Sequence, residues 1–302
     1  MKWKLTTLIE NHIDKEERYE CEHGLSIFVE SVNQESPVRL LIDTGQSGLF
    51  YDNAMKMGIS LANLSALLIS HAHYDHAGGV KRLLEEVNVR KLYVGKDFFQ
   101  EKYHEKKDGT LKNIGIPFSR EALEKKGISV CEIQKEEQII FPGVTVYRNF
   151  ERAVEYERLN PHFFVKKKGS GCGCCTGEII SQITASEGSS MYKKDGFTDE
   201  IAVAFDVEGG LVVIVGCSHP GIMNILKTIE HRSGKRICGV IGGTHLMEAD
   251  EERLRRTIAD LKEKDIDFIA VSHCTGDENL EIIKESFGEK FIFNCTGNVI
   301  KF

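Results

Sequence analysis

A six-residue segment with the sequence HAHYDH, beginning at His71, constrains this 302-residue chain more than any other feature. It places three imidazoles and one carboxylate directly after residues 64–70, an apolar run typical of a strand covered on both faces. Loops at strand ends hold side chains over a rigid scaffold, so such a cluster can converge on metal ions. His71 and His73 project to one side of an extended backbone, whereas Asp75 and His76 follow where the chain turns into a helix. The segment can therefore face two cations, one for each pair of side chains. Imidazole and carboxylate ligands together suit zinc, iron or manganese.

The rest of the chain alternates predicted strands and helices, which indicates a single α/β layered domain over residues 1–302. Strands are expected over residues 24–31, 38–43, 64–70, 91–94, 201–207, 211–215, 237–241, 268–271 and 290–300, with a hairpin over 138–150. Helices are expected over residues 79–87, 221–231, 251–264 and 280–287. The charged, irregular residues 96–127 read as an insertion. Residues 151–199 read as a long Cys/Gly-rich loop, which is usually functional or mobile.

Charge and hydropathy exclude some classes of function. The formal net charge is −7, which argues against a general nucleic-acid binder. The longest apolar run, Leu211 to Val215, is too short to span a bilayer, so no membrane partner is expected. The first residues lack the sustained apolar core of a signal peptide. We therefore expect a cytoplasmic protein that acts on a small molecule.

The histidine-rich segment, together with elements before and after it, resembles the metallo-β-lactamase superfamily. The H-x-H-x-D-H signature of that superfamily stands at residues 71–76, and its upstream aspartate–glycine element stands at residues 43–45. Similar elements recur at residues 216–221 (GCSHPG), 242–246 (GGTHL) and 272–276 (SHCTG). With residues 22–26 (EHGLS), this set looks most like the dihydropteroate-synthase-related subfamily, which includes a dihydropterin-methyl-(ribofuranosyl)aminobenzene phosphate synthase. The resemblance implies an αββα sandwich carrying a dinuclear metal site.

Site residues carried over from this resemblance come from distant parts of the chain. His71 and His73 would bind one metal, and Asp75 and His76 the second, with His273 as the last metal-binding histidine. Asp43 would orient a ligand imidazole from beneath the site, although an aspartate before Gly45 can also simply form a turn.

One histidine of the wider superfamily pattern is missing, because residues 192–200 contain none. His219 is expected to supply the missing imidazole, with Cys217 as the competing metal ligand. His245 also ends a predicted strand. It is expected to bind substrate or act as an acid or base, with a structural histidine or an additional ligand as alternatives.

Nine cysteines form the second signal, because three of them lie within four residues among glycines. Thiolates are soft ligands for zinc or for an iron–sulfur cluster such as 4Fe-4S. Cys172, Cys174 and Cys175 are the expected ligands, with Cys21 as the fourth and Cys295 in reserve. A zinc knot, redox thiols and a metal-free loop remain open. A cluster would also imply a redox partner, which the neighbouring lysines 166–168 could attract if it is acidic.

The combined expectation is a metal-dependent enzyme acting on a phosphorylated or pterin-like small molecule. Two divalent ions, zinc most naturally and manganese or iron otherwise, could hold a departing diphosphate or assist hydrolysis. A hydrolase of an ester, lactone or phosphodiester is therefore the first alternative. An iron–sulfur redox or sensor protein on the same scaffold is the second.

Overall fold

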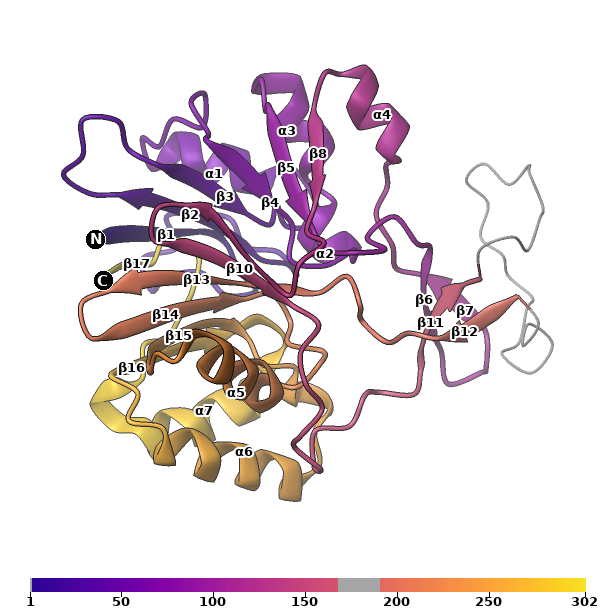
Figure 1. Ribbon diagram of the computed structural model, residues 1–302, viewed down its shortest axis with the longest axis vertical. Helices are drawn as coiled ribbons and strands as arrows, with labels where there is room; N and C mark the ends of the chain where they lie inside the picture. The colour runs from indigo at the N-terminus through magenta and orange to yellow at the C-terminus, as the bar shows by residue number, and fades with distance from the viewer. Residues whose placement is uncertain (1, 168–190) are drawn as a thin grey trace.

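The computed structural model describes residues 2–167 and 191–302 of the chain. Two large mixed sheets lie face to face, and helices cover the outer face of each (Figure 1). This is the expected four-layer αββα arrangement.

The first sheet has seven strands in the order β17-β1-β2-β3-β4-β5-β8. Their bounds are β1 Trp3–Ile9, β2 Ser26–Ser31, β3 Arg39–Ile42, β4 Ala66–Leu68, β5 Lys91–Val94, β8 Ser129–Glu132 and β17 Val299–Lys301. Its helices are α1 Leu49–Lys56, α2 Tyr74–Ala77, α3 Val80–Glu86 and α4 Arg120–Lys125. Strands β1 to β3 pair antiparallel, while β3, β4, β5 and β8 run parallel.

The second sheet has six strands in the order β16-β15-β14-β13-β10-β9. Their bounds are β9 Glu137–Phe141, β10 Val144–Arg148, β13 Ile201–Val207, β14 Gly210–Val215, β15 Ile237–Gly243 and β16 Phe268–Ser272. Its helices are α5 Ile222–Ser233, α6 Glu251–Glu263 and α7 Asp277–Phe287, with short 3-10 turns η1 Leu246–Glu248, η2 His273–Thr275 and η3 Gly288–Lys290. Strands β14, β15 and β16 are parallel, so their carboxyl ends meet at one edge.

Three apolar layers hold the sandwich together. The middle layer lies between the sheets, where Trp3, Ile27 and Phe205 are fully buried. A second layer packs α5, α6 and α7 on the six-stranded sheet, and a third packs α1 and α3 on the seven-stranded sheet. Burial of this kind stabilises by roughly 25 cal/mol per Å² of apolar surface and fixes both sheets as rigid supports.

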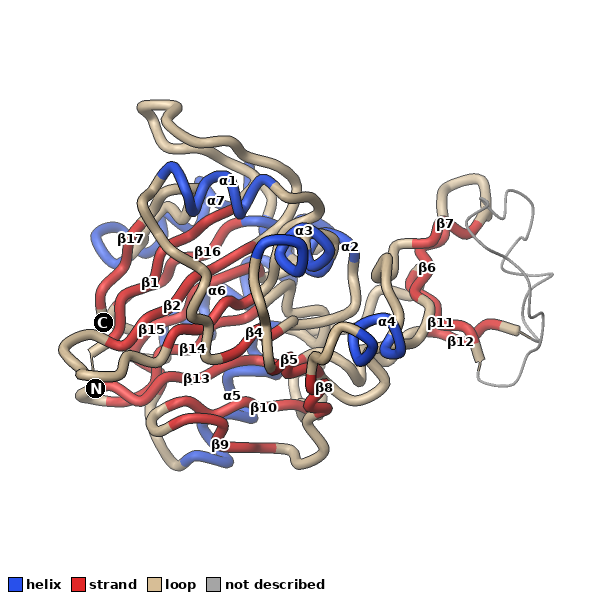
Figure 2. Tube along the Cα trace, turned by 90° about the horizontal axis from the view of Figure 1, so that it is seen from above, coloured by secondary structure: helices blue, strands red, loops and turns tan. Residues whose placement is uncertain are grey.

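A small third sheet stands apart from the sandwich (Figures 1 and 2). Its order is β12-β11-β6-β7, from β6 Lys102–Glu105, β7 Leu111–Asn113, β11 Phe163–Lys166 and β12 Tyr192–Lys194. The insertion expected over residues 96–127 supplies two of these strands. The other two come from residues 151–199, for which the sequence predicts a loop. These strands are three or four residues long and carry several charged side chains, so they show no apolar alternation.

Other differences from the sequence expectation concern β1, α1 and β17. The edge strand expected over residues 290–300 is regular only at β17, and the sequence reading missed β1 and α1. Strands β1 and β17 pair with each other, which brings the two ends of the described chain side by side (Figure 1). Within residues 2–167 and 191–302, no helix is long and apolar enough to cross a bilayer.

Candidate metal centre

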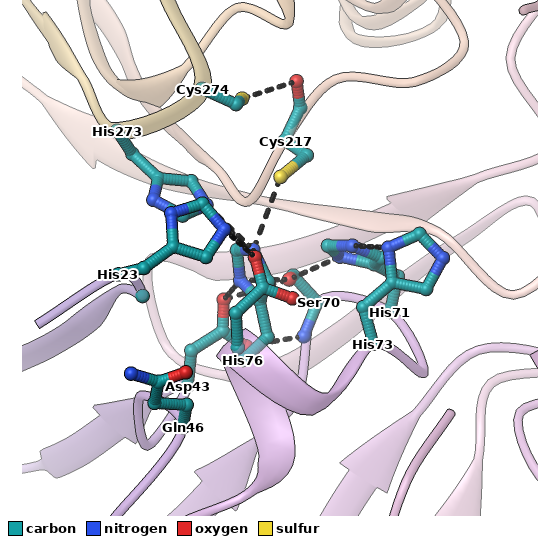
Figure 3. A network of polar contacts seen from close by, with 12 residues as sticks. His23, Asp43, Gln46, Ser70, His71, His73, His76, Cys217, His273 and Cys274 are labelled. Carbon is teal, nitrogen blue, oxygen red and sulfur yellow. Dashed lines mark hydrogen bonds and ion pairs between the residues drawn. The ribbon is translucent and has the colours of Figure 1, made fainter. Parts of the chain in front are cut away.

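The candidate centre lies where strand ends of the two large sheets meet. From the seven-stranded sheet, Asp43 directly follows β3, and the histidine-rich segment follows β4. From the six-stranded sheet, Cys217 and His219 follow β14, and His273 follows β16. The parallel pairing of these strands in each sheet explains why residues so far apart in sequence converge (Figure 3).

One group of imidazoles consists of His71, His73 and His219, whose ligand atoms all lie within 4.8 Å of one another. His71 Nε2 is 3.0 Å from His73 Nδ1. Both ring nitrogens of His219 and the Nε2 atom of His73 are buried and have no hydrogen-bond partner among the described residues. Leaving buried polar atoms unpaired costs about 1–3 kcal/mol each, so the arrangement favours an additional bound group.

A second group consists of Asp75, His76, Cys217 and His273, again with ligand atoms within 4.8 Å. His76 Nε2 lies 3.1 Å from both Cys217 Sγ and His273 Nε2. Asp75 Oδ2 lies 3.4 Å from His273 Nε2. Cys217 and His219 are therefore not competitors in this geometry, because each completes a different group.

Asp43 supports the second group from beneath. Its carboxylate is fully buried and accepts hydrogen bonds from the Ser70 backbone N–H and the Ser70 hydroxyl, both at 2.7 Å. Its Oδ2 atom also lies 2.6 Å from His76 Nδ1, which leaves Nε2 of His76 facing the other ligand atoms. Ser70 Oγ is in turn 3.0 Å from His71 Nδ1, so one aspartate orients an imidazole in each group through short contacts.

Four residues of this region adopt the left-handed backbone conformation without being glycine. They are Asp43, Ser218, His245 and His273, with φ between 50° and 62°. Such backbone costs about 1–3 kcal/mol and persists only where surrounding structure over-determines it. At Asp43 and His273 it turns the side chain that follows a strand toward His76.

Burial and charge set the protonation of these groups. Burial is the main cause that lowers the pKa of His71, His73 and His219 well below the ordinary value, so these rings are neutral. Burial also acts against the charged form of His76, but the Asp75 and Asp43 carboxylates outweigh it and raise its pKa to about 9. For Asp75, burial is outweighed by His76, His23 and His273, which hold its pKa well below the usual range.

Several contributors were not assigned a role from the sequence. His23 Nε2 lies 3.3 Å from Asp75 Oδ2, and Gly24 is required there because a Cβ would come within 2.6 Å of the Asp75 carbonyl oxygen. Asp199 Oδ2 accepts from the Ala72 backbone N–H at 2.8 Å, between the first two ligand histidines. Buried Lys102 binds Asp199 at 2.6 Å. Of these residues, only His23 lies in a motif that the sequence analysis identified, the EHGLS segment at residues 22–26.

Other predicted residues lie elsewhere. His245 is outside both groups and instead lies with Cys217 and Cys274. Cys21 is exposed and Cys295 half-buried, and both are free thiols. Cys172, Cys174 and Cys175 lie outside the described residues, so the predicted iron–sulfur ligation stays a prediction.

Divalent cations fit the two groups. The first group offers three neutral, buried imidazoles, and the second offers two imidazoles, an ionised carboxylate and a thiol. These are donors that zinc, iron or manganese takes, and the unpartnered ring nitrogens of His219 and His73 are available to a cation. His71, His73 and His219 would hold one ion, and Asp75, His76, Cys217 and His273 the other.

Comparison with known proteins gives one family match and several relatives. Residues 23–163 match the sequence model of the metallo-beta-lactamase superfamily. A 7,8-dihydropterin-6-methyl-4-(beta-D-ribofuranosyl)-aminobenzene-5'-phosphate synthase of Methanocaldococcus jannaschii is 29% identical, and the match covers 99% of this chain and 96% of the relative. A hydroxyacylglutathione hydrolase of Francisella tularensis is 32% identical, but the match covers only 36% of this chain and 43% of the relative.

Solved structures share the fold. A metal-dependent hydrolase of the beta-lactamase superfamily superposes with a TM-score of 0.79 at 27% identity, covering 99% of this chain and 98% of the other. A diphosphatase from the PhnP family has a TM-score of 0.51 at 11% identity and shows likeness of fold alone.

Proposed function

This chain belongs to the metallo-beta-lactamase superfamily and is an enzyme of that superfamily, and on that premise we propose that it couples or cleaves a phosphorylated, pterin-like small molecule. The observation that carries the proposal is the similarity to the methanogen synthase along nearly the whole of both chains. The match to the hydroxyacylglutathione hydrolase covers only 36% of this chain, so it gives weaker support than the match to the synthase.

In this proposal the chain's own residues hold and orient two divalent ions. Asp43 fixes His76 and, through Ser70, His71, while His23 orients the Asp75 carboxylate. When bound, the ions supply Lewis acidity and positive charge that stabilise negative charge developing on a phosphate or diphosphate. Asp75 stays ionised throughout because three imidazoles surround it.

A coupling assay tests the synthase reaction. The purified, zinc-, manganese- or iron-loaded chain receives a dihydropterin with a diphosphate ester on its 6-methyl carbon and 4-(β-D-ribofuranosyl)aminobenzene 5'-phosphate. The arylamine nitrogen forms a bond to the methyl carbon, the carbon–oxygen bond to diphosphate breaks, and the amine loses a proton to solvent. Mass spectrometry is expected to detect the coupled product and free diphosphate. Both should disappear in His71→Ala and Asp75→Ala and persist in the exposed-site control His231→Ala.

Hydrolysis is the second candidate function. It is favoured by the similarity in fold and sequence to the metal-dependent hydrolase. Release of diphosphate without coupled product, or turnover of a phosphodiester, ester or lactone, would select it over the synthase reaction.

We also propose that Cys172, Cys174 and Cys175 ligate an iron–sulfur cluster, with Cys21 as the fourth ligand. The support is their spacing among glycines and the exposure of Cys21 as a free thiol. Anaerobic purification should give a brown protein containing iron and sulfide that Cys174→Ser loses, whereas an iron-free, colourless preparation contradicts the cluster. An acidic redox partner is expected only if the cluster is present.

A further inference from the structure

Beside the two metal-binding groups lies a third cluster of ligand side chains, formed by Cys217, His245 and Cys274. All three residues are buried, and their ligand atoms lie within 4.8 Å of one another. His245 follows β15 and Cys274 lies in η2 after β16, so this cluster is built from the same sheet edge as the centre. Figure 3 shows the two cysteines side by side, with Cys217 Sγ directed to His76.

The His245 ring is oriented in the way that metal-binding histidines are. Its Nε2 atom lies 3.0 Å from the Glu248 carboxylate, which itself accepts a hydrogen bond from Asn160. Its Nδ1 atom is buried and has no hydrogen-bond partner among the residues the structure describes. A histidine that ligates a metal almost always gives its other ring nitrogen to such a carboxylate. The left-handed backbone of His245, with φ of 50°, is a further cost that a purely structural histidine does not require.

Contacts with the backbone and space beside a glycine hold the Cys274 sulfur in place. It accepts a hydrogen bond from the His245 backbone N–H at 3.2 Å and lies 3.4 Å from the Cys217 carbonyl oxygen. Gly243 makes room for it, since a Cβ there would lie 2.5 Å from Cys274 Sγ. These contacts fix the position of the sulfur beside His245 and Cys217.

We propose that Cys217, Cys274 and His245 form a third cation site, for a thiophilic ion such as zinc or cadmium, with the Cys217 sulfur shared with the neighbouring group. Two sulfurs and one imidazole nitrogen are a softer donor set than that of either group in the centre, so this site selects soft cations. It assigns His245 to ligation rather than to acid–base chemistry, and it does not depend on which reaction the enzyme performs. Glu248 is the positioning residue of the site.

Cadmium binding to the full chain tests this site. Equilibrium dialysis with cadmium ions alone is expected to show one ion fewer per chain in Cys274→Ser than in the unaltered protein. The ultraviolet cadmium–thiolate absorption should fall with it. Cys238→Ser is the matched control, because Cys238 is a buried thiol that donates to the Leu211 carbonyl away from the centre. All other cysteines are the same in the three proteins, so their contribution cancels. Equal stoichiometry and absorption in Cys274→Ser and the unaltered protein would overturn the proposal.

Two further variants separate this site from the dinuclear centre. Glu248→Gln is expected to weaken the Cys274-dependent ion about 10- to 100-fold without changing the stoichiometry at saturation. His73→Ala should remove an ion of the first group and leave the Cys274-dependent absorption intact. Loss of that absorption in His73→Ala, or unchanged cadmium affinity in Glu248→Gln, contradicts the assignment.

Crystals of the unaltered chain grown with cadmium give a test that needs no variant. An anomalous-scattering peak bonded to both Cys217 Sγ and Cys274 Sγ is expected. Peaks confined to the two groups of the centre, with Cys274 Sγ unligated, would overturn the third site even if the enzyme proves to be the proposed synthase.

Discussion

At the scale of single residues, the centre depends on buried groups that orient the ligands. Asp43 binds both Ser70 and His76, so Asp43→Asn keeps the side-chain shape and removes the charge that orients the imidazole. Loss of such a supporting contact typically weakens metal affinity about 10- to 100-fold. Competition with a chromophoric chelator measures this. Asp52→Asn, an exposed substitution on α1, should bind metal as the unaltered chain does, and equal affinities in the two variants would contradict the role of Asp43.

A different residue-scale prediction concerns His219, whose two ring nitrogens are buried without partners among the described residues. His219→Leu is expected to stabilise the metal-free protein by about 1 kcal/mol, because it removes unpaired polar atoms at the cost of stacking on Phe197. The same change should remove one bound ion. Urea unfolding with and without metal measures both effects, with His231→Leu as the exposed control. Lower stability of the metal-free variant would show that His219 is a structural residue.

At the scale of elements, a buried ion cluster joins the small sheet to the metal-binding loop. Lys102 of β6 is 2% exposed and binds Asp195 at 2.7 Å and Asp199 at 2.6 Å, and Asp199 holds the Ala72 N–H. Lys102→Met leaves two carboxylates buried without their cation, which is expected to cost about 3–5 kcal/mol. Urea unfolding measures this. Lys56→Met, which breaks only an exposed pair with Glu20, should cost no more than about 1 kcal/mol.

The loss of unfolding free energy in Lys102→Met should also depend on pH, and the direction of that dependence can be derived. Burial already raises the pKa of Asp199 in the intact cluster, and losing the lysine raises it further. A carboxyl whose folded pKa exceeds its unfolded value stabilises the fold below the unfolded pKa and loses that contribution as pH rises. The deficit relative to the unaltered chain is therefore expected to shrink as the pH falls below neutral. A deficit that stays constant on acidification would mean that the carboxylates remain ionised in the folded variant.

The sequence indicated most of the large elements and the ligand types, but not the small sheet. Long apolar runs such as β4 and β14 carry a clear signal because both their faces are buried. Strands β6 and β12 carry charged residues, and both pair with β11. The β6–β11 pairing joins residues 102–104 to residues 163–165, a long-range contact that local patterns do not contain. For the same reason, the sequence did not predict roles for Lys102 and Cys274, because these roles depend on partners that only the fold brings close. The competition expected between Cys217 and His219 arose because sequence order does not show which group each side chain faces.

At the scale of the whole molecule, one centre is shared between two halves of the chain. His71, His73, Asp75 and His76 come from the seven-stranded sheet, whereas Cys217, His219 and His273 come from the six-stranded sheet. Each proposed ion takes ligands from both, so its binding energy is available only when the two sheets are packed together. Metal binding should therefore couple the stability of both halves rather than stabilise one of them.

Removal of metal tests that coupling. Ions at about a thousand times their dissociation constant stabilise the folded state by about 4 kcal/mol for each site, so chelation should lower the melting temperature of the chain. Hydrogen exchange is expected to rise at the carboxyl ends of β4, β14 and β16 together, and to stay unchanged at the distant β9–β10 hairpin. An Asp75→Ala chain should already melt near the chelated value and respond little to chelator. Exchange that rises at the end of β4 alone would mean that only one half of the chain holds the ions. The packing of the two sheets would then depend on the apolar layer between them and not on the metal.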